Sequence, residues 1–434
     1  MSKKSKIQAV KGMKDILPSD SHLWLMVESM CADIFSRRGY RQIRTPMLES
    51  THLFARSIGA ETDIVSKEMY TFEDRNGDSL TLRPEGTASC VRAGIENGLF
   101  YNQQQRLWYT GPMFRHERPQ KGRYRQFYQV GVESYGWSTP DIEAEVLAMV
   151  EQLFSELGLT NTTLYINSLG DAASRASYRD ALVDYLNEYK DQLDEDSVRR
   201  LGSNPLRILD SKNEKVQSLL DNAPVILDYL SDESKLHFAT LQDYLTTLGI
   251  EFEINPKLVR GLDYYNDTVF EWINHDYGAQ STVCGGGRYD SMVEQMGGQD
   301  TPAFGFGMGL ERLIEMLQEQ NASSLEISQS CEVFIVSVGD KARLQAIKLQ
   351  DVLTKQGLSV QCHMGAGSMK NQFKKADKSL ALIGLVIGDA EAQSNQVNVK
   401  VLRKELAQKT DMEQQRSVSQ DDVVNVVTNL LDSL

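Results

Sequence analysis

Two strand-like segments with a basic loop between them constrain this chain more than any other feature. The segments RLWYTGPMFRHE, from Arg106, and YRQFYQVGVESYG, from Tyr124, follow each other without an intervening helix, and a shorter strand-like piece precedes them at 80–83. Strand segments that succeed one another in this way indicate an antiparallel sheet. The chain is therefore expected to contain such a sheet.

Helices are expected on either side of this region in the sequence. Apolar residues at helical spacing in LWLMVESMCADIF predict a first helix, with capping side chains at 19–21 and a stop at Gly39. A short strand over 41–45 is expected next. Thr139 has the character of an N-cap before a proline at the first helical position, which predicts a helix through Leu157 with a glycine after it.

The chain then divides into an inserted module and a second domain. Residues 172–248 are helix-prone, charged and poor in glycine, which predicts a mainly helical insertion. Strand character returns at FEINPKLVRGLDYYNDTVFEWI, a helix is expected near Gly309, and the polar stretch 318–330 is typical of a linker. Beyond it, strand-like segments alternate with helical ones, as in a small α/β domain with a largely parallel sheet. We expect one domain over 1–325 and another over 331–434.

Composition excludes several classes of protein. Hydrophobic residues make up 41% and charged residues 24% of the chain, and nowhere do about 18 apolar residues follow one another, so a cytoplasmic protein without a membrane span is expected. The five cysteines are scattered and never spaced C-x-x-C, which argues against disulfides or a thiolate metal site and for small core residues. A net charge of −14 argues against indiscriminate nucleic-acid binding but allows one local basic RNA-binding surface.

The basic loop and its returning strand form the first candidate binding site. The loop holds Arg115, Arg118, Lys121, Arg123 and Arg125. Arginine forks pair with phosphate oxygens, and Phe127 could stack on a base, although charge alone favours a solvated hairpin. In a regular strand, residues 127, 129, 131 and 133 face one side. A ring, the amide of Gln129 and the carboxylate of Glu133 would then share one ligand-binding face.

Two further segments carry polar residues for which the pattern leaves alternatives open. Glu85 and Thr87 follow a strand end in LRPEGT, where they fit either a substrate ammonium or a turn with a helix cap. Arg260, within LVRGLDYYNDTVFEW, is flanked by apolar residues. It suits either a structural ion pair or the neutralisation of charge on a reacting phosphate.

Glycine marks the last two candidate segments. GGGRYD at 285–290 indicates either a flexible turn or a place where the backbone approaches a ligand closely. AFGFGMGLERL, from Ala303, is a glycine-rich strand-to-helix turn before Arg312. Neither G-x-G-x-x-G nor G-x-x-x-x-G-K-[ST] is present, so Rossmann dinucleotide sites and P-loops are excluded.

Together these segments resemble the class II aminoacyl-tRNA synthetases, and among them closely the histidyl-tRNA synthetase family. Motif 1 of the class corresponds to the region from Cys31 to Pro46, motif 2 to FRHERPQKGRYRQFYQ and motif 3 to GFGMGLERL, while LVRGLDYY and GGGRYD mark the histidine enzymes. The resemblance covers essentially the whole chain. It implies an α+β fold, with an antiparallel-sheet class II catalytic domain over 1–325 that carries the helical insertion at about 172–248, and an α/β anticodon-binding domain over 331–434.

The resemblance also implies residues that bind ATP and support catalysis. The ATP set is Arg115, Glu117, Arg123, Phe127 and Arg312. Glu117 and Phe127 would hold adenine, and Arg123 and Arg312 would contact the outer phosphates. Arg115, Arg260 and Arg312 are the implied catalytic residues. Arg260 would offset the charge that builds up as the histidine carboxylate displaces pyrophosphate.

A second implied set binds L-histidine. It consists of Glu85, Thr87, Arg115, Gln129, Glu133, Arg260, Tyr264, Tyr265 and Tyr289. The ammonium would meet Glu85, Thr87 and Gln129. The imidazole would meet Glu133 and Tyr265.

Partners and a rival function follow from the same resemblance. It implies ATP accompanied by Mg²⁺, tRNA(His), a homodimer and no protein-held metal. The rival is a non-catalytic, histidyl-synthetase-like regulatory subunit of histidine biosynthesis, which would tend to lack the intact arginines and the C-terminal domain. A plain RNA-binding protein fits the acidic composition less well. A synthetase for another amino acid would lack LVRGLDYY.

Overall fold

The computed structural model describes residues 7–59, 62–276, 282–320, 331–403 and 415–432. The chain divides into two compact units, Met1–Asn321 and Ala322–Leu434. The polar stretch expected to be a linker falls largely outside the described residues. Each unit has its own sheet and its own core, and each is described here by itself.

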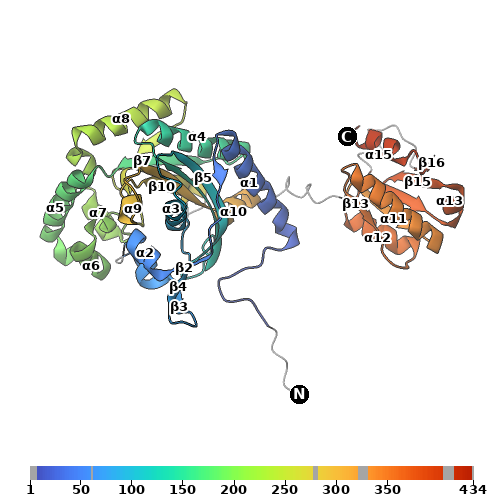
Figure 1. The fold of residues 1–434 in the computed structure, drawn as a ribbon, viewed down its shortest axis with the longest axis horizontal. Coiled ribbons are helices and arrows are strands. Elements are labelled where there is room, and N and C mark those ends of the chain that lie inside the picture. The colour runs from blue at the N-terminus through green and yellow to red at the C-terminus, as the bar shows by residue number, and fades with distance from the viewer. Residues whose placement is uncertain (1–6, 60–61, 277–281, 321–330, 404–414, 433–434) are drawn as a thin grey trace, which may run out of the picture. The chain divides into compact units, whose positions relative to one another are not determined.

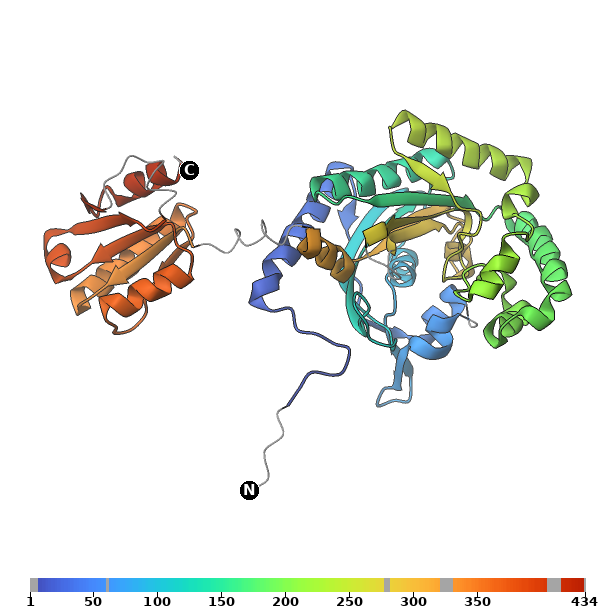
Figure 2. The same cartoon turned by 180° about the vertical axis from the view of Figure 1, so that it is seen from behind.

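The first unit is built on an eight-stranded sheet with the order β1-β5-β6-β11-β10-β9-β7-β8. Its strands are β1 (Arg41–Gln42), β5 (Gln105–Phe114), β6 (Gln126–Tyr135), β7 (Thr162–Ser168), β8 (Phe252–Ile254), β9 (Asn266–Asn274), β10 (Thr282–Arg288) and β11 (Ala303–Gly309). The pairs β1·β5 and β7·β8 at the two edges are parallel, and all others are antiparallel. The long hairpin of β5 and β6 is the predicted pair of strands, and the prediction of an antiparallel sheet is confirmed (Figures 1 and 2).

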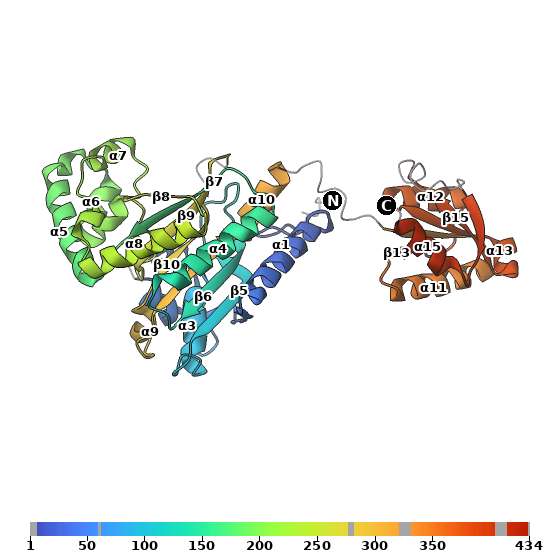
Figure 3. The same cartoon turned by 90° about the horizontal axis from the view of Figure 1, so that it is seen from above.

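Helices cover both faces of this sheet. The helices α1 (Pro18–Arg37), α4 (Pro140–Glu156) and α10 (Leu310–Gln320) lie together on one face (Figure 3). Phe35 of α1 packs edge-on against Trp108 of β5 and Phe306 of β11, which are even-numbered positions on their strands. The other face is approached by α2 (Thr51–Ile58), α3 (Thr87–Glu96) and α9 (Met292–Gln295), together with a small sheet of β2 (Leu48–Ser50), β4 (Ser79–Leu82) and β3 (Tyr70–Glu73) and the short π-helix Ile64–Glu68.

The segment expected to be a helical insertion lies between β7 and β8. It contains α5 (Ala172–Glu188), α6 (Glu195–Ser203), α7 (Glu214–Leu220) and α8 (Asp232–Thr247), with the 3₁₀ turns η2 (Lys190–Gln192), η3 (Pro205–Ile208) and η4 (Ile226–Tyr229). Because both neighbouring strands belong to the large sheet, the module is tied to the sheet at both ends. Buried side chains of its helices continue the core that lies against α2 and α3.

The second unit is a five-stranded sheet between helices. The strand order is β13 (Val360–Cys362), β12 (Val333–Ser337), β14 (Ile383–Ile387), β15 (Gln396–Val401) and β16 (Gln415–Ser419). The helices are α11 (Asp340–Lys355), α12 (Met369–Lys378), α13 (Asp389–Ser394) and α15 (Val423–Leu431). Two of the four strand pairings are parallel and two antiparallel, so the expectation of a largely parallel sheet was wrong. The strand β15 pairs antiparallel with β14 on one side and with β16 on the other, although the short helix α13 lies between β14 and β15 in the chain.

Two helix starts differ in detail from the sequence prediction. The first helix begins at Pro18, and no side chain caps it, so the expected caps at 19–21 lie inside the helix. Proline fits the first turn because its N–H would be unpaired there anyway. Thr139 does occupy the N-cap position of α4, but its hydroxyl contacts Asp141 rather than a backbone N–H.

Two glycines were predicted to end helices, and the cysteines were predicted to be core residues. Gly39 and Gly158 follow the ends of α1 and α4 with positive φ, as expected of stop residues. All five cysteines are free, and four of them are buried. Among the described residues, no helix is both long and apolar enough to cross a membrane.

Candidate active site

A floor of glycines at the centre of the large sheet creates the site. Gly131 of β6, Gly307 of β11 and Gly285 of β10 are direct neighbours across the strands, and the next row contains Glu133, Gly305 and Gly287. A Cβ atom on Gly305 would collide with the carboxylate of Glu133, and one on Gly307 with the amide of Gln129. Because glycine has no side chain, the groups on neighbouring strands can lie flat across the sheet. GGGRYD therefore begins inside a strand, and its interpretation as a flexible turn was wrong.

Glu133 is the most deeply buried carboxylate on this floor. Its oxygens accept hydrogen bonds from the hydroxyls of Thr87 at 2.8 Å and Tyr109 at 3.1 Å, and from that of Tyr289. Burial raises the pKa of Glu133 to about 8, although these hydroxyls favour the ionised form. A carboxylate can accept about four hydrogen bonds, so one acceptor position is left for a ligand.

Glu85 and Thr87 lie where α3 begins. The carboxylate of Glu85 accepts hydrogen bonds from the backbone N–H groups of Thr87 at 2.6 Å and Ala88 at 2.8 Å. This is the helix-end alternative that the sequence left open. Burial raises the pKa of Glu85, while the two N–H donors act in the opposite direction. Thr87 links the two buried carboxylates into one cluster, because its backbone N–H donates to Glu85 and its hydroxyl donates to Glu133.

Arg260 lies over the glycine floor from the other side. Its guanidinium covers Gly285 and forms an ion pair with Glu271 of β9. The ring of Tyr265 lies 5.9 Å from the guanidinium carbon, and Tyr264 and Tyr289 pack against that ring. The Nε atom of Arg260 is buried without a hydrogen-bond partner among the described residues, so this donor is available to a ligand.

The basic loop contributes a second group of side chains. Arg115 leaves β5 and donates from Nε to the carbonyl of Pro84 at 2.8 Å, with its guanidinium 5.2 Å from the centre of the Phe127 ring. Glu117 lies beside it and pairs with Nε of Arg123 at 2.8 Å. Two fixed cations and a half-buried ring therefore surround one carboxylate.

Arg312 joins this loop to the glycine floor. It lies on α10, and it donates from Nε to the carbonyl of Gly122 at 3.1 Å and from Nη1 to that of Thr282 at 2.6 Å. A cavity of about 180 Å³ opens between these groups. Its lining includes Arg115, Glu117, Arg123, Phe127, Gln129, Arg260, Arg312, Gly285, Gly307 and Gly309.

The predicted site residues thus fall into two adjoining sets. The implied ATP residues, Gln129 and Arg260 line the open cavity, whereas Glu85, Thr87, Glu133, Tyr264, Tyr265 and Tyr289 form the buried cluster behind it. Arg260 touches both sets through Tyr265. A larger cavity of about 1140 Å³, partly lined by the helical insertion, shares Arg115, Glu117 and Arg123 with the first.

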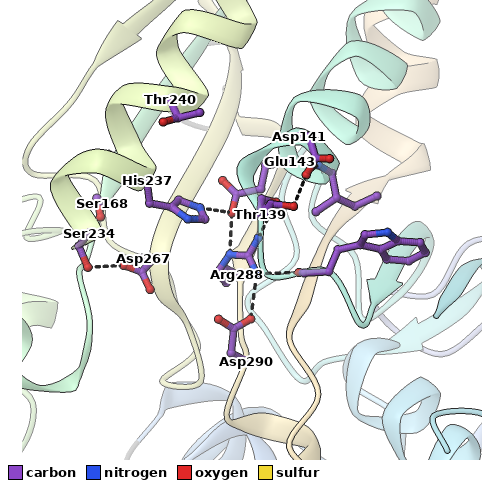
Figure 4. Close-up of polar contacts among 12 residues, drawn as sticks. Thr139, Asp141, Glu143, Ser168, Ser234, His237, Thr240, Asp267, Arg288 and Asp290 are labelled. Atoms are coloured by element: carbon purple, nitrogen blue, oxygen red, sulfur yellow. Dashed lines mark hydrogen bonds and ion pairs between the residues drawn. The ribbon is translucent and has the colours of Figure 1, made fainter. Parts of the chain in front are cut away.

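Arg288, the arginine of GGGRYD, anchors the end of β10 just before Tyr289. It is fully buried and pairs with Glu143 of α4 through Nε at 2.6 Å and with Asp290 through Nη1 at 3.1 Å. His237 of α8 bonds to the same Glu143 carboxylate at 2.7 Å (Figure 4). Arg288 is therefore not among the residues that line the cavity, and through Glu143 it joins β10 to α4 and α8.

Two site residues were missed from the sequence. Tyr109 donates to Glu133, and its ring fills the space that the absent side chains of Gly86 and Gly131 leave open. Glu271 pairs with Arg260. Tyr109 and Gly131 are cross-strand neighbours in the predicted hairpin. Pairing the residues of the two strands on paper would therefore have shown that Tyr109 lies opposite this glycine. Glu271 could have been noticed as a single charge inside the apolar strand VFEWI.

A family model for histidyl-tRNA synthetase matches residues 12–313, and one for an anticodon binding domain matches residues 332–430. The chain belongs to the histidyl-tRNA synthetase family. The apo histidyl-tRNA synthetase of S. aureus is 37% identical with a TM-score of 0.80, over 97% of this chain and 100% of that one. The resemblance and the α+β fold class are confirmed. The chain is a class II aminoacyl-tRNA ligase of the histidine type.

Two more distant structures share the fold. A histidyl-tRNA synthetase from Nostoc sp. is 19% identical with a TM-score of 0.69, over 98% of this chain and 100% of that one. A Bacillus halodurans protein described as an ATP phosphoribosyltransferase regulatory subunit/histidyl-tRNA synthetase is 21% identical with a TM-score of 0.65, over 89% of this chain and 99% of that one. At these identities the likeness concerns the fold alone.

Proposed function

We propose that the open cavity binds ATP and that the buried cluster receives L-histidine, so that the two substrates meet beside Arg260. The observation that carries the proposal is the arrangement of arginines. Arg115, Arg260 and Arg312 come from three distant parts of the chain and line one cavity, beside a cluster of buried carboxylates and tyrosines. Cations suit phosphates and carboxylates suit an ammonium and a ring N–H.

The proposed chemistry proceeds in two steps. An oxygen of the histidine carboxylate attacks the α-phosphorus of ATP, and pyrophosphate leaves with its negative charge. Arg115 and Arg260 stabilise the charge at the α-phosphate, and Arg123 and Arg312 hold the outer phosphates. A terminal ribose hydroxyl of tRNA(His) then attacks the acyl carbon, and AMP leaves. Each step depends on positioning and electrostatics, with no covalent enzyme intermediate.

Adenine and histidine have separate proposed contacts. Glu117 and Phe127 would hold adenine, with the ring of Phe127 already packed against Arg115. Glu85, Thr87 and Gln129 would bind the ammonium. The imidazole would occupy the acceptor position left on Glu133, with Tyr265 as its other polar neighbour and Tyr264 and Tyr289 around it. Three hydroxyls already bond to Glu133, which supports a carboxylate held in one orientation.

Mg²⁺ is proposed to arrive with ATP. Among the described residues, no three His, Cys, Asp or Glu side chains form a group that could hold a metal ion. The phosphates would therefore supply most of the ligands of the ion, as is usual for Mg²⁺. Neither of the two proposed chemical steps requires a protein side chain to bind the Mg²⁺ ion.

The remaining proposals concern the whole molecule. Residues 1–325, with the insertion at about 172–248, would be the catalytic domain, and 331–434 would bind the anticodon of tRNA(His). A cytoplasmic homodimer paired through the motif 1 region is proposed from the family. The rival regulatory function is disfavoured because all three catalytic arginines are present.

The test is ATP–pyrophosphate exchange with each amino acid in turn. Histidine alone should support exchange, and subsequent charging should require tRNA(His). Exchange with another amino acid at a comparable rate would exclude the assigned specificity. Histidine binding without any exchange would favour the regulatory function.

A further inference from the structure

The loop between β8 and β9 carries Arg260 and Tyr265 but has no regular secondary structure. Residues 255–265 form no helix or strand. Its first half is held by the sheet, since Asn167 of β7 donates to the carbonyls of Pro256 and Leu258. In its second half the backbone N–H of Asp263 donates to the carbonyl of Ile58 of α2 at 3.2 Å. Arg260 and Tyr265 themselves need further anchors, because a loop with few such bonds is among the least stable parts of a fold.

The helical insertion supplies these anchors at the two functional residues themselves. Arg207 of η3 donates from Nη1 to the backbone carbonyl of Arg260 at 2.8 Å. Arg175 of α5 donates from Nη1 to the backbone carbonyl of Tyr265 at 2.5 Å. Between them, Asn204 donates from its amide to the carboxylate of Asp263 at 2.7 Å. Three side chains of the insertion thus bond to the second half of the loop, and a fourth, Asp221, pairs with Lys257 in the first half.

The local packing is adapted to these contacts. A Cβ atom on Gly261 would lie 3.3 Å from Nη1 of Arg207, so glycine leaves the guanidinium room to reach the backbone. Arg200 in turn donates to the carbonyl of Arg207 at 3.1 Å and lies 3.5 Å from the carboxylate of Asp63, a partly exposed residue just before the π-helix. Arg207 is therefore held by hydrogen bonds at its backbone carbonyl as well as at its guanidinium group.

We propose that Arg207 and Arg175 are positioning residues for adenylate formation. Arg207 fixes the position of Arg260, and Arg175 fixes the position of Tyr265. The inference rests on the roles proposed above for those two residues. Neither arginine of the insertion touches the reacting atoms. Each holds the backbone from which a functional side chain projects, and misplacement of a catalytic group by about 1 Å can cost about a hundredfold in rate.

The two anchors are expected to affect different kinetic parameters. Arg260 acts on charge that develops in the transition state, so Arg207→Ala should lower kcat for exchange by about ten- to a hundredfold with the KM for histidine little changed. Tyr265 contacts the bound ring, so Arg175→Ala should raise the KM for histidine about tenfold, the size expected for one hydrogen bond from a charged donor, with the KM for ATP unchanged. An arginine with only a structural role would not produce this split.

Matched controls exist nearby in the insertion. Arg179 of α5 and Arg199 of α6 are exposed and pair with Asp180 and Asp196 on their own helices. Arg179→Ala and Arg199→Ala should leave both parameters unchanged. Arg207→Lys keeps a cationic donor and should restore most of kcat. Hydrogen exchange of the peptide that spans residues 258–265 should be faster in Arg207→Ala than in Arg199→Ala.

The outcomes separate this inference from the proposed function. Suppose that Arg207→Ala and Arg207→Lys both fold and catalyse ATP–pyrophosphate exchange at the wild-type rate, while Arg260→Ala does not. The positioning role is then wrong and the proposed chemistry stands. If Arg260→Ala is itself active, the proposed chemistry fails first. If Arg207→Ala does not fold, Arg207→Lys provides the test. The inference is also wrong if Arg207→Lys keeps the wild-type rate of amide hydrogen exchange in residues 258–265 but has a reduced kcat, because a retained donor should preserve both the loop and the rate.

Discussion

Glu133 combines complete burial with three hydroxyl donors, and this combination makes its protonation sensitive to pH near neutrality. Its ordinary pKa of 4.5 is raised to about 8 because burial disfavours the charge more strongly than the hydroxyls support it. Below pH 8 the carboxyl is largely protonated and accepts poorly from an imidazole N–H. Raising the pH through 8 ionises it and creates the acceptor that the neutral ring requires.

The KM for histidine should therefore fall as the pH rises from about 7, above the range in which free imidazole loses its proton, through 8, and level off about one unit above the pKa. Glu133→Gln cannot titrate, and its KM should be flat across this window. Steady-state exchange at constant ionic strength measures both profiles. A wild-type profile without slope, or the same slope in the variant, would contradict the assignment of the titration to Glu133.

The position of these residues on the strands was predictable, but their partners were not. Alternation along one strand predicted that Gln129 and Glu133 share a face, and the glycine floor opposite them agrees. Alternation within one strand contains no information about neighbouring strands. Tyr109 and Glu271 therefore remained unnoticed, and so did the anchoring of Arg260 by an arginine more than fifty positions away.

At the scale of elements, local signals predicted the antiparallel hairpin, α4 and the helix after Gly309. The failures have one common cause. GGGRYD was interpreted from glycine's flexibility, whereas its strand β10 is fixed by hydrogen bonds on both sides. The C-terminal sheet was interpreted from alternating strands and helices, but β15 pairs antiparallel with both β14 and β16. Tertiary pairing overrides local composition in both cases.

Helices α4 and α8 are joined to β10 by one buried carboxylate, Glu143. Burial raises its pKa, but the charge of Arg288 and the bond from His237 outweigh that effect and lower the pKa to about 2 (Figure 4). A depressed carboxyl pKa contributes stability above its unfolded value of 4.5, and that contribution is lost as the pH falls toward 2. The shift corresponds to a contribution on the order of 3 kcal/mol.

Glu143→Gln should thus reduce the free energy of unfolding at pH 6, and the difference from wild type should shrink as the pH falls from 4.5 toward 2. Glu156→Gln provides the control, since Glu156 is exposed near the end of the same helix. Denaturant unfolding followed at several pH values measures the difference. A constant difference between wild type and Glu143→Gln over this range would show that the ion pairs do not set the pKa.

The whole molecule is proposed to work as a pair. An interface of identical surfaces is isologous, and the class II family generally pairs through motif 1, which here spans the end of α1 and β1. We expect a particle of about twice 48.9 kDa by light scattering. A mass of one chain across micromolar concentrations would contradict the dimer.

The division into two units predicts a separation of activities. All proposed substrate residues lie before residue 321, and none lies in the second unit. A chain cut near Ser330 should keep its rate of ATP–pyrophosphate exchange within about tenfold of the full chain, because a tenfold change corresponds to the loss of about one supporting interaction. The same fragment should lose most of its ability to charge tRNA(His). If exchange and charging fell equally in a fragment that is folded and dimeric, the second unit would have to contribute to the first reaction.

The choice of histidine depends on one buried acceptor, and Glu133→Gln tests it most directly. The substitution keeps the size of the side chain but replaces the charged acceptor by an amide, and a site that reads a polar group rejects a mismatch far better than apolar shape does. The measurement is the KM for each substrate in ATP–pyrophosphate exchange above pH 8, where the carboxyl is ionised. We predict a large rise in the KM for histidine, with the KM for ATP little changed, and a smaller rise for Tyr265→Phe. If Glu133→Gln instead weakened ATP, or changed neither KM, the imidazole would not be read by this carboxylate.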